Sequence, residues 1–214
     1  IDWSRFARTE ELTTVDFREE KAATIVLIID AREEAYLAPE TDAQHAVQRS
    51  IGAADRLVTS LIDAGHRVGL ASMSPDDSCW QAPSAARTVR DEVRSLLTTH
   101  PSLDPRPPTG EFRPFGWVDW FSARAPRGTQ VVLFSPLCDQ LIEESIIRME
   151  ARGHPVTIFS PDPTTDGTIG RELAHLDRRV TIDALRRRGI RIVDWPHDEP
   201  IEMSLERLAT AEQT

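Results

Sequence analysis

The sequence has almost no lysine. Lys21 is the one lysine among 25 basic residues, and 35 aspartates and glutamates give a formal net charge of −10. A net negative surface repels nucleic acid phosphates, so the composition disfavours a general role in binding DNA or RNA. An acid excess with so little lysine is typical of proteins from salt-loving cells, where carboxylates keep the surface hydrated. An acidic domain from an arginine-rich genome is the alternative explanation.

Cysteines and long apolar runs are also scarce. Cys79 and Cys138 lie far apart, too few for a disulfide framework and without zinc-site spacing, which fits a reducing cytoplasm. No run of 18 apolar residues is present, so we expect no membrane span, and no charged-then-apolar leader precedes the first strand. The 214 residues suit one well-cored domain. Because the chain starts at Ile1 and not at Met, we expect it to be part of a longer protein.

Short apolar runs alternate with helical periodicities along the chain. Residues 24–30 (TIVLIID) form a continuous apolar run that ends in a carboxylate, as in a central parallel strand. Apolar residues then recur at steps of three and four over about residues 42–64, which predicts a helix that Gly65 ends. Residues 66–73 predict a second strand, and such a β-α-β unit pairs its strands in parallel.

The alternation continues to the end of the chain. Residues 78–82 predict an antiparallel edge strand, Ser84 is a suitable N-cap for a helix that buries Val89 and Val93, and five prolines between residues 101 and 114 predict an inserted loop. The later predicted elements are a helix over 115–121, a strand over 129–135, a helix over 137–151 with Leu141, Ile142, Ile146 and Met149 inward, a strand over 154–160, a helix over 171–188 broken near Val180, a strand over 190–195 and an amphipathic helix over 201–211. This order predicts an α/β fold with a doubly wound, mostly parallel sheet, one antiparallel edge strand and helices on both faces.

The amino-terminal segment has the most specific pattern. Residues 2–12 read DWSRFARTEEL and residues 15–20 read VDFREE, directly before the predicted first strand. The segment resembles the hallmark of the domain-of-unknown-function-58 family, in which D/H-W, A-R-T, a leucine and an alternating acidic strand precede a von Willebrand factor A-like domain. The resemblance implies a von Willebrand factor A-like (Rossmann-like) fold, with residues 1–23 as an arm and residues 24–214 as the domain. With the composition, it indicates a protein of this family from a halophilic archaeon.

The arm has a structural role and a further candidate role. Its apolar residues are expected to pack on the domain, and its arginines to clamp acidic side chains such as Glu19. Trp3, Arg5 and Arg8 are in addition candidates for contact with a partner protein.

The resemblance also implies a metal-ion-dependent adhesion site, which here is degenerate. A-type domains hold a divalent ion through D-x-S-x-S after the first strand, a loop threonine and an aspartate after the fourth strand, because magnesium prefers such hard oxygen ligands. The motif here reads D-A-R-E-E from Asp30, so Arg32 and Glu34 stand at the serine positions, and a proline follows Ser135 where the aspartate is expected. Thr109 matches the loop threonine only weakly. A guanidinium has no lone pair for a metal, so we expect neither magnesium nor another cofactor.

Arg32 has two open roles. It can take the place of the ion and pair with Asp30 or Glu34, which would order the loop without a metal. It can instead receive a carboxylate or phosphate of a partner in the crevice at the carboxyl ends of the strands. The first role predicts that magnesium or manganese does not raise the melting temperature.

Aromatic and histidine residues give weaker signals. The aromatic segment over residues 112–121 is expected to be a buried cap on the core; the alternative is that Trp117 and Trp120 form a partner-binding patch. The six histidines have no metal-binding spacing, and His66 and His154, which begin strands, are expected at the surface.

Two classes of function remain. The first is a non-catalytic interaction or scaffold domain, which would use Arg32 and Glu34. For this class the resemblance implies a MoxR-type AAA+ ATPase as partner and a cytoplasmic domain that an upstream segment anchors to the membrane. The alternative is a metal-dependent hydrolase or nuclease that uses Asp30 and Asp194, although no tight carboxylate cluster is evident.

Overall fold

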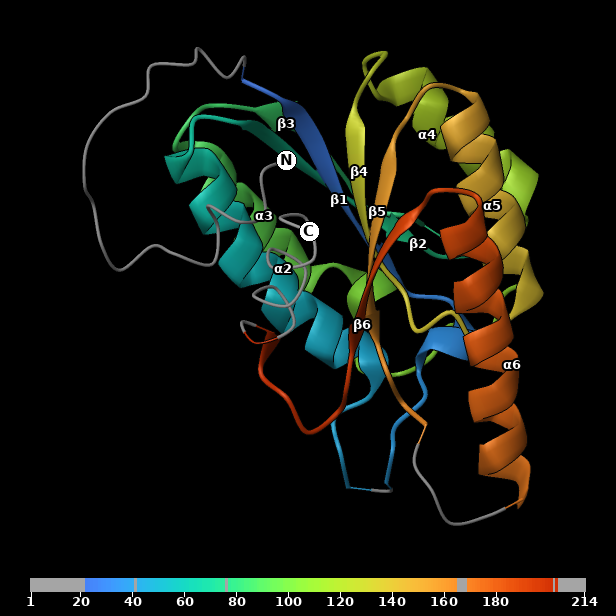
Figure 1. The fold of residues 1–214 in the computed structure, drawn as a ribbon. Coiled ribbons are helices and arrows are strands. Elements are labelled where there is room, and N and C mark those ends of the chain that lie inside the picture. The colour runs from blue at the N-terminus through green and yellow to red at the C-terminus, as the bar shows by residue number, and fades with distance from the viewer. Residues whose placement is uncertain (1–21, 41, 76, 165–168, 202, 204–214) are drawn as a thin grey trace.

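A six-stranded sheet forms the centre of the molecule (Figure 1). The computed structural model describes residues 22–40, 42–75, 77–164, 169–201 and 203. The strand order is β3-β2-β1-β4-β5-β6; all neighbours are parallel except β2 and β3, which are antiparallel. The strands are β1 (Thr24–Asp30), β2 (Arg67–Met73), β3 (Trp80–Ser84), β4 (Gln130–Phe134), β5 (Val156–Pro161) and β6 (Arg191–Trp195). The helices are α2 (Ala46–Asp63), α3 (Thr88–Thr99), α4 (Pro114–Arg124), α5 (Gln140–Ala151) and α6 (Ile169–Arg187), with short 3-10 turns η1 (Glu33–Ala35) and η2 (Pro101–Leu103).

The sheet separates two apolar layers. Ile25, Leu27 and Ile29 of β1 share one core with α2 and α3, whereas Val26 and Ile28 share the other with α4, α5 and α6. Figure 1 shows these two groups of helices on opposite sides of the sheet. Because successive side chains of a strand point to opposite faces and both faces are covered, β1 is apolar along almost its whole length. The predicted doubly wound α/β architecture with one antiparallel edge strand is confirmed.

The predicted starts of α2 and α3 are wrong. The helix α2 begins at Ala46 and not near Asp42, since His45 Nδ1 accepts the N–H of Gln48 and the Gln48 side chain accepts the N–H of His45. Ser84 belongs to β3 and caps no helix; its hydroxyl accepts the N–H of Ala86, and α3 begins at Thr88.

Three other predictions need correction or lie outside the described residues. The helix α6 is continuous through Val180, whereas a break was expected. Leu141 is exposed and not inward, although Ile142, Ile146 and Met149 are buried as predicted. The helix expected over 201–211 falls almost wholly outside the described residues. Within the described part of the chain, no helix is long and apolar enough to cross a membrane.

The carboxyl ends of the parallel strands share one edge of the sheet. The chain runs from β1 outward through β2 to β3, and then returns to β4 on the other side of β1. The strand order therefore reverses between β1 and β4. In open α/β sheets a crevice opens at the carboxyl end of such a reversal, and the residues that follow β1 and β4 lie there.

Candidate functional site

Four polar residues form a row across the carboxyl edge of the sheet. Ile29 of β1 is in register with Phe134 of β4, which is in register with Phe159 of β5, which is in register with Val193 of β6. The residue that follows each of these four in the chain is polar; the row is Asp30, Ser135, Ser160 and Asp194. Buried polar groups at the end of an apolar sheet need partners, and two arginines supply them.

Arg32 bridges the first strand and the loop after the fourth. Its Nε and Nη2 donate to the two carboxylate oxygens of Asp30, both at 2.8 Å. Its Nη1 and Nη2 donate to the two oxygens of Asp139 at 3.0 and 2.8 Å. The Ser135 hydroxyl donates to Asp30 Oδ2 at 2.7 Å, and the guanidinium carbon lies 5.2 Å from the centre of the Phe112 ring. These two paired, planar contacts fix the arginine between two carboxylates. We call Asp30, Arg32, Ser135 and Asp139 the Arg32 cluster.

The loop between β4 and α5 brings Asp139 to this position. Leu137 has a left-handed backbone (φ 58°), which is uncommon for a branched side chain, and its side chain is fully buried. Its N–H donates to the Ser135 hydroxyl at 3.3 Å. Asp139 then caps α5, since its carboxylate accepts the N–H of Ile142 at 3.1 Å. One carboxylate therefore starts a helix and holds Arg32.

Burial and charge act in opposite directions on Arg32. Burial by itself lowers the pKa of the guanidinium, but the charges and hydrogen bonds of Asp30 and Asp139 outweigh it and raise that pKa above its usual value. The Arg32 cation is therefore permanent. Burial also raises the pKa of the neighbouring Cys138 thiol to about 12, so this thiol is not an activated nucleophile at neutral pH.

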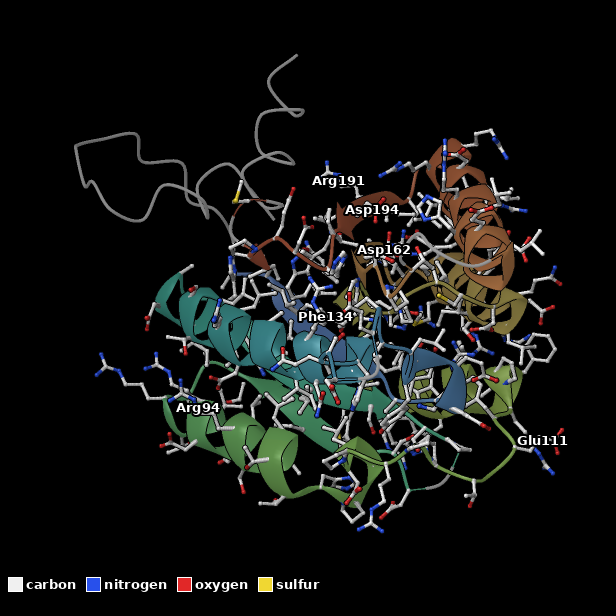
Figure 2. The ribbon with its side chains drawn as sticks, turned by 90° about the horizontal axis from the view of Figure 1, so that it is seen from below. Arg94, Glu111, Phe134, Asp162, Arg191 and Asp194 are labelled. Atoms are coloured by element: carbon white, nitrogen blue, oxygen red, sulfur yellow. The ribbon has the colours of Figure 1, made fainter. Side chains whose placement is uncertain are left out.

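A second buried arginine holds the other half of the row. Arg178 of α6 is 1% exposed; its Nη2 donates to Asp194 Oδ1 at 2.7 Å and to the Ser160 hydroxyl at 2.9 Å. Its Nε donates to the carbonyl of Pro136 at 2.9 Å, and its Nη1 lies 3.3 Å from Asp162 Oδ2. Figure 2 looks onto this edge and shows Asp162 and Asp194 next to each other. The two arginines thus occupy the carboxyl edge from β1 to β6.

A hollow of about 710 Å³ opens beside the Arg32 cluster. Its lining includes Arg32, the η1 turn and the loop before α4. A second hollow of about 550 Å³ shares the loop residues Glu111, Phe112 and Arg113 and continues toward Trp117 and Trp120. In Figure 2, Glu111 projects from the rim, on the side of the molecule away from Asp194.

A family model identifies the chain. The model described as "Protein of unknown function DUF58" matches residues 1–166. The chain belongs to this family. No functionally curated protein matches the chain.

Solved structures with low identity resemble this DUF58 chain. An aerotolerance-related membrane protein from Bacteroides fragilis has 13% identity and a TM-score of 0.49, with 89% of this chain and 98% of that chain covered. The VWA domain of SpRpn10 has 12% identity and a TM-score of 0.46, with 90% and 95% covered. Proximal thread matrix protein 1 from the mussel byssus has 12% identity and a TM-score of 0.45, with 88% and 46% covered. At these identities nothing that those proteins bind or do transfers to this chain.

The predicted site residues of the DUF58 domain are only partly brought together. Asp30 is hydrogen-bonded to both Arg32 and Ser135. Glu34 is exposed in η1, and Arg32 pairs with Asp139 in its place. Thr109 is exposed in its loop. Trp3, Arg5 and Arg8 lie outside the described residues.

Burial bears on three further expectations. Arg32 is 1% exposed and its N–H groups bind two carboxylates, which favours the first of its two predicted roles. Binding of a partner's carboxylate or phosphate by Arg32 stays a prediction. Trp117 is buried, and its indole N–H donates to the carbonyl of Ser72 at 3.0 Å, which agrees with the core explanation; Trp120 is half-buried. His154 is buried against Phe121 and not at the surface.

Asp30 and Asp194 do not form one site. They are separated by β4 and β5, and three spacings between neighbouring strands amount to roughly 14 Å. Each is bound to a different buried arginine. A two-metal site needs carboxylates around ions about 4 Å apart. In the described ranges, no group of three or more His, Cys, Asp or Glu side chains is arranged to hold a metal ion.

The sequence patterns missed three residues of the site. Asp139 was assigned to a helix that was expected to start at Leu137, although its position before an apolar helical stripe is a usual N-cap signal. Arg178 and Asp162 gave no signal, because their partners are distant in sequence. Only the packing of α6 over β5 and β6 brings them together.

Proposed function

We propose that the domain is a non-catalytic protein-interaction module in which the Arg32 guanidinium takes the place of the divalent ion of metal-binding A-type domains. The observation that carries this proposal is the double pairing of Arg32 with Asp30 and Asp139, with Ser135 bound to Asp30. A cation fixed in the fold gives the carboxyl edge a constant shape and charge that do not depend on metal supply.

The donors around Arg32 do not suit a metal ion. Both oxygens of Asp30 and both oxygens of Asp139 accept N–H groups of Arg32. A divalent ion would have to displace these bonds and lie beside a permanent positive charge, which costs Coulomb energy in a poorly solvated place. The chemistry of these residues therefore supports recognition and not Lewis-acid catalysis.

We further propose a MoxR-type AAA+ ATPase as the partner and, for the whole protein, anchoring to a membrane outside the segment described here. The resemblance of the amino-terminal segment suggests this partner and this anchor, and the match to the DUF58 family supports the resemblance itself. The test is binding of this domain to the purified ATPase from the same genome, measured by surface-immobilised titration with and without EDTA. Equal binding in both conditions is expected; loss of binding in EDTA would contradict an ion-free interface.

A metal titration tests the substitution of arginine for the ion. We expect 10 mM magnesium or manganese, on the order of a usual screening concentration, to leave the melting temperature of the native chain unchanged, because the oxygens of the site are occupied. The variant Arg32→Ser should lose about 3–5 kcal/mol, because Asp30 and Asp139 are left as uncompensated like charges. Magnesium should recover part of that loss.

The control is the double variant Arg32→Ser with Asp30→Asn, which removes the carboxylate with the strongest contacts to Arg32. This variant should not respond to magnesium, because one of the two charged ligands is gone. A magnesium-dependent rise in the native chain, or none in Arg32→Ser, contradicts the proposal.

A further inference from the structure

The hollow beside the Arg32 cluster combines exposed apolar side chains with acidic groups that make no ion pair with any other described residue. We call it the acidic groove and define it by Arg32, Glu33, Glu34, Glu111, Phe115 and Leu141. We propose that it binds a segment of a partner protein that presents arginine or lysine next to an apolar side chain. This inference rests on the proposed function and names the chemistry of the partner.

The inner end of the groove does not attract acidic groups. Arg32 uses four N–H directions on Asp30 and Asp139, so one guanidinium faces two carboxylates and the cluster keeps an excess negative charge. An acidic side chain of a partner would meet that charge. In metal-binding A-type sites the ion is positive and keeps an open position for an acidic side chain. The Arg32 cluster is net negative and therefore attracts a basic group instead.

The walls of the groove are acidic as well. Glu33, Glu34 and Glu111 are exposed, and none makes an ion pair within the residues that the structure describes. The basic residues of this lining are Arg113 and Arg32, and Arg32 is already paired with Asp30 and Asp139. Exposed carboxylates in a concave wall raise the local concentration of cations, so the groove favours a basic segment.

Phe115 and Leu141 add an apolar contact. Phe115 is 52% exposed on α4, and Leu141 is 41% exposed on α5. Arginine and lysine side chains have apolar stems that pack on such surfaces while the charged end reaches carboxylates. Aromatic side chains paired with arginine are frequent anchors at protein interfaces. Anionic lipids and nucleic acids have the wrong sign of charge for this surface.

Two blocked peptides test the proposal directly on the whole chain. One has the sequence Gly-Arg-Phe-Leu-Arg-Gly, and its counterpart has glutamate in place of both arginines. By calorimetric titration at low salt, we expect the basic peptide to bind at least about tenfold more tightly than the acidic one, and to weaken as salt screens the carboxylates. Equal binding, tighter binding of the acidic peptide, or no measurable binding of the basic peptide overturns the proposal.

Reversing the charge of two groove residues tests whether the peptide binds in the acidic groove. Glu33→Lys with Glu34→Lys should weaken binding of the basic peptide by at least about tenfold. The control is Asp91→Lys with Glu92→Lys, which changes the charge by the same amount on exposed positions of α3 and should leave binding unchanged. Phe115→Ser with Leu141→Ser should weaken binding of both peptides. Melting curves check that each variant folds.

The outcome separates this inference from the proposed function. A chain that shows no peptide preference but still binds the AAA+ ATPase retains the interaction role, and only the groove is wrong. Equal weakening by the α3 control and by the groove variant would show an effect of net charge alone and would also overturn the groove.

Discussion

At the residue scale, two buried arginines pair with the carboxylates along the carboxyl edge of the sheet. Arg32 and Arg178 are each 1% exposed, and each lies against two carboxylates. Removing a charge from water costs several kcal/mol, which only near-complete hydrogen bonding offsets. Buried arginine–carboxylate pairs therefore contribute little net stability. A misfolded arrangement that separates them is costly, because it leaves a buried charge without a partner. The edge is therefore specified by charge pairing more than by apolar packing.

Because His154 is buried, we expect the free energy of unfolding to fall in acid. Burial lowers the pKa of its imidazole below the usual 6.5, and the nearby Arg152 charge lowers it further, despite a hydrogen bond to the backbone of Thr129. The unfolded chain therefore takes up a proton at a higher pH than the folded chain does. The contribution of His154 to stability is complete above about pH 6.5 and is lost as pH falls from there toward the folded pKa.

Replacing His154 by Phe should flatten this dependence. Urea unfolding between pH 7 and pH 5, the usual range for a histidine transition, should show a smaller fall in the free energy of unfolding than in the native chain. Exposed His197→Gln is the matched control and should keep the native slope. A native slope in His154→Phe would mean that other groups cause the acid sensitivity.

The contact of Arg32 with Asp30 could be predicted from the sequence, whereas the contacts that involve Asp139 and Arg178 could not. The two-residue step from Asp30 to Arg32 is local, so a contact between them was a reasonable prediction. Asp139 joins through a loop whose left-handed Leu137 no propensity rule anticipates. Arg178 meets Asp194 because α6 packs on the last strands. Long-range pairs of this kind depend on tertiary packing, which composition and periodicity do not encode.

At the element scale, Gly69 determines how the edge strand approaches β2. A Cβ at this position would lie 2.5 Å from the carbonyl oxygen of Gln81 and 2.9 Å from the nitrogen of Pro83. Both are backbone atoms of β3, so β3 would have to move. The register of β2 and β3 also shifts between Val68 and Leu70, as expected where backbones approach closely.

Gly69→Ala should therefore destabilise the chain by about 1–3 kcal/mol, the usual range for forced overpacking, as measured by urea unfolding. Gly52→Ala in α2 is the control, because nothing lies within 4 Å of a Cβ there. That change should be neutral or stabilising by a few tenths of a kcal/mol up to about 1, since alanine favours helices. Similar losses in both variants would contradict a clash specific to β3.

Elements were predictable where apolar periodicity alone defines them. The limits of β1 agree with the prediction because the run from Thr24 to Asp30 is apolar on both faces. Boundaries failed where a side-chain cap begins the helix, as His45 does for α2 and Asp139 for α5. Leu141 was assigned to the core since it fits an apolar stripe, but that stripe does not indicate how far the neighbouring α4 covers it.

At the scale of the whole molecule, acidic charge exceeds basic charge by ten. Surface ion pairs such as Arg94–Asp55 and Arg90–Asp63 are exposed to solvent, which screens them, so each contributes little to stability. Self-repulsion among the excess carboxylates acts over the entire surface and is not confined to contact distance. Salt weakens both the attraction within ion pairs and the repulsion among carboxylates. Because negative charges are in excess, weakening the repulsion should change the stability more.

We therefore expect potassium chloride to raise the melting temperature. Between about 0.1 and 1 M the Debye length falls from about 10 to 3 Å, so carboxylates further apart than one side chain no longer repel each other. A gain of about 1–2 kcal/mol corresponds to roughly 2–8 °C for a chain of this size. Glu33→Gln with Glu34→Gln and Glu111→Gln removes three exposed negative charges, so the variant should have a higher melting temperature at low salt and gain less from added salt. A melting temperature that falls with salt would show that the ion pairs, and not the repulsion, control stability.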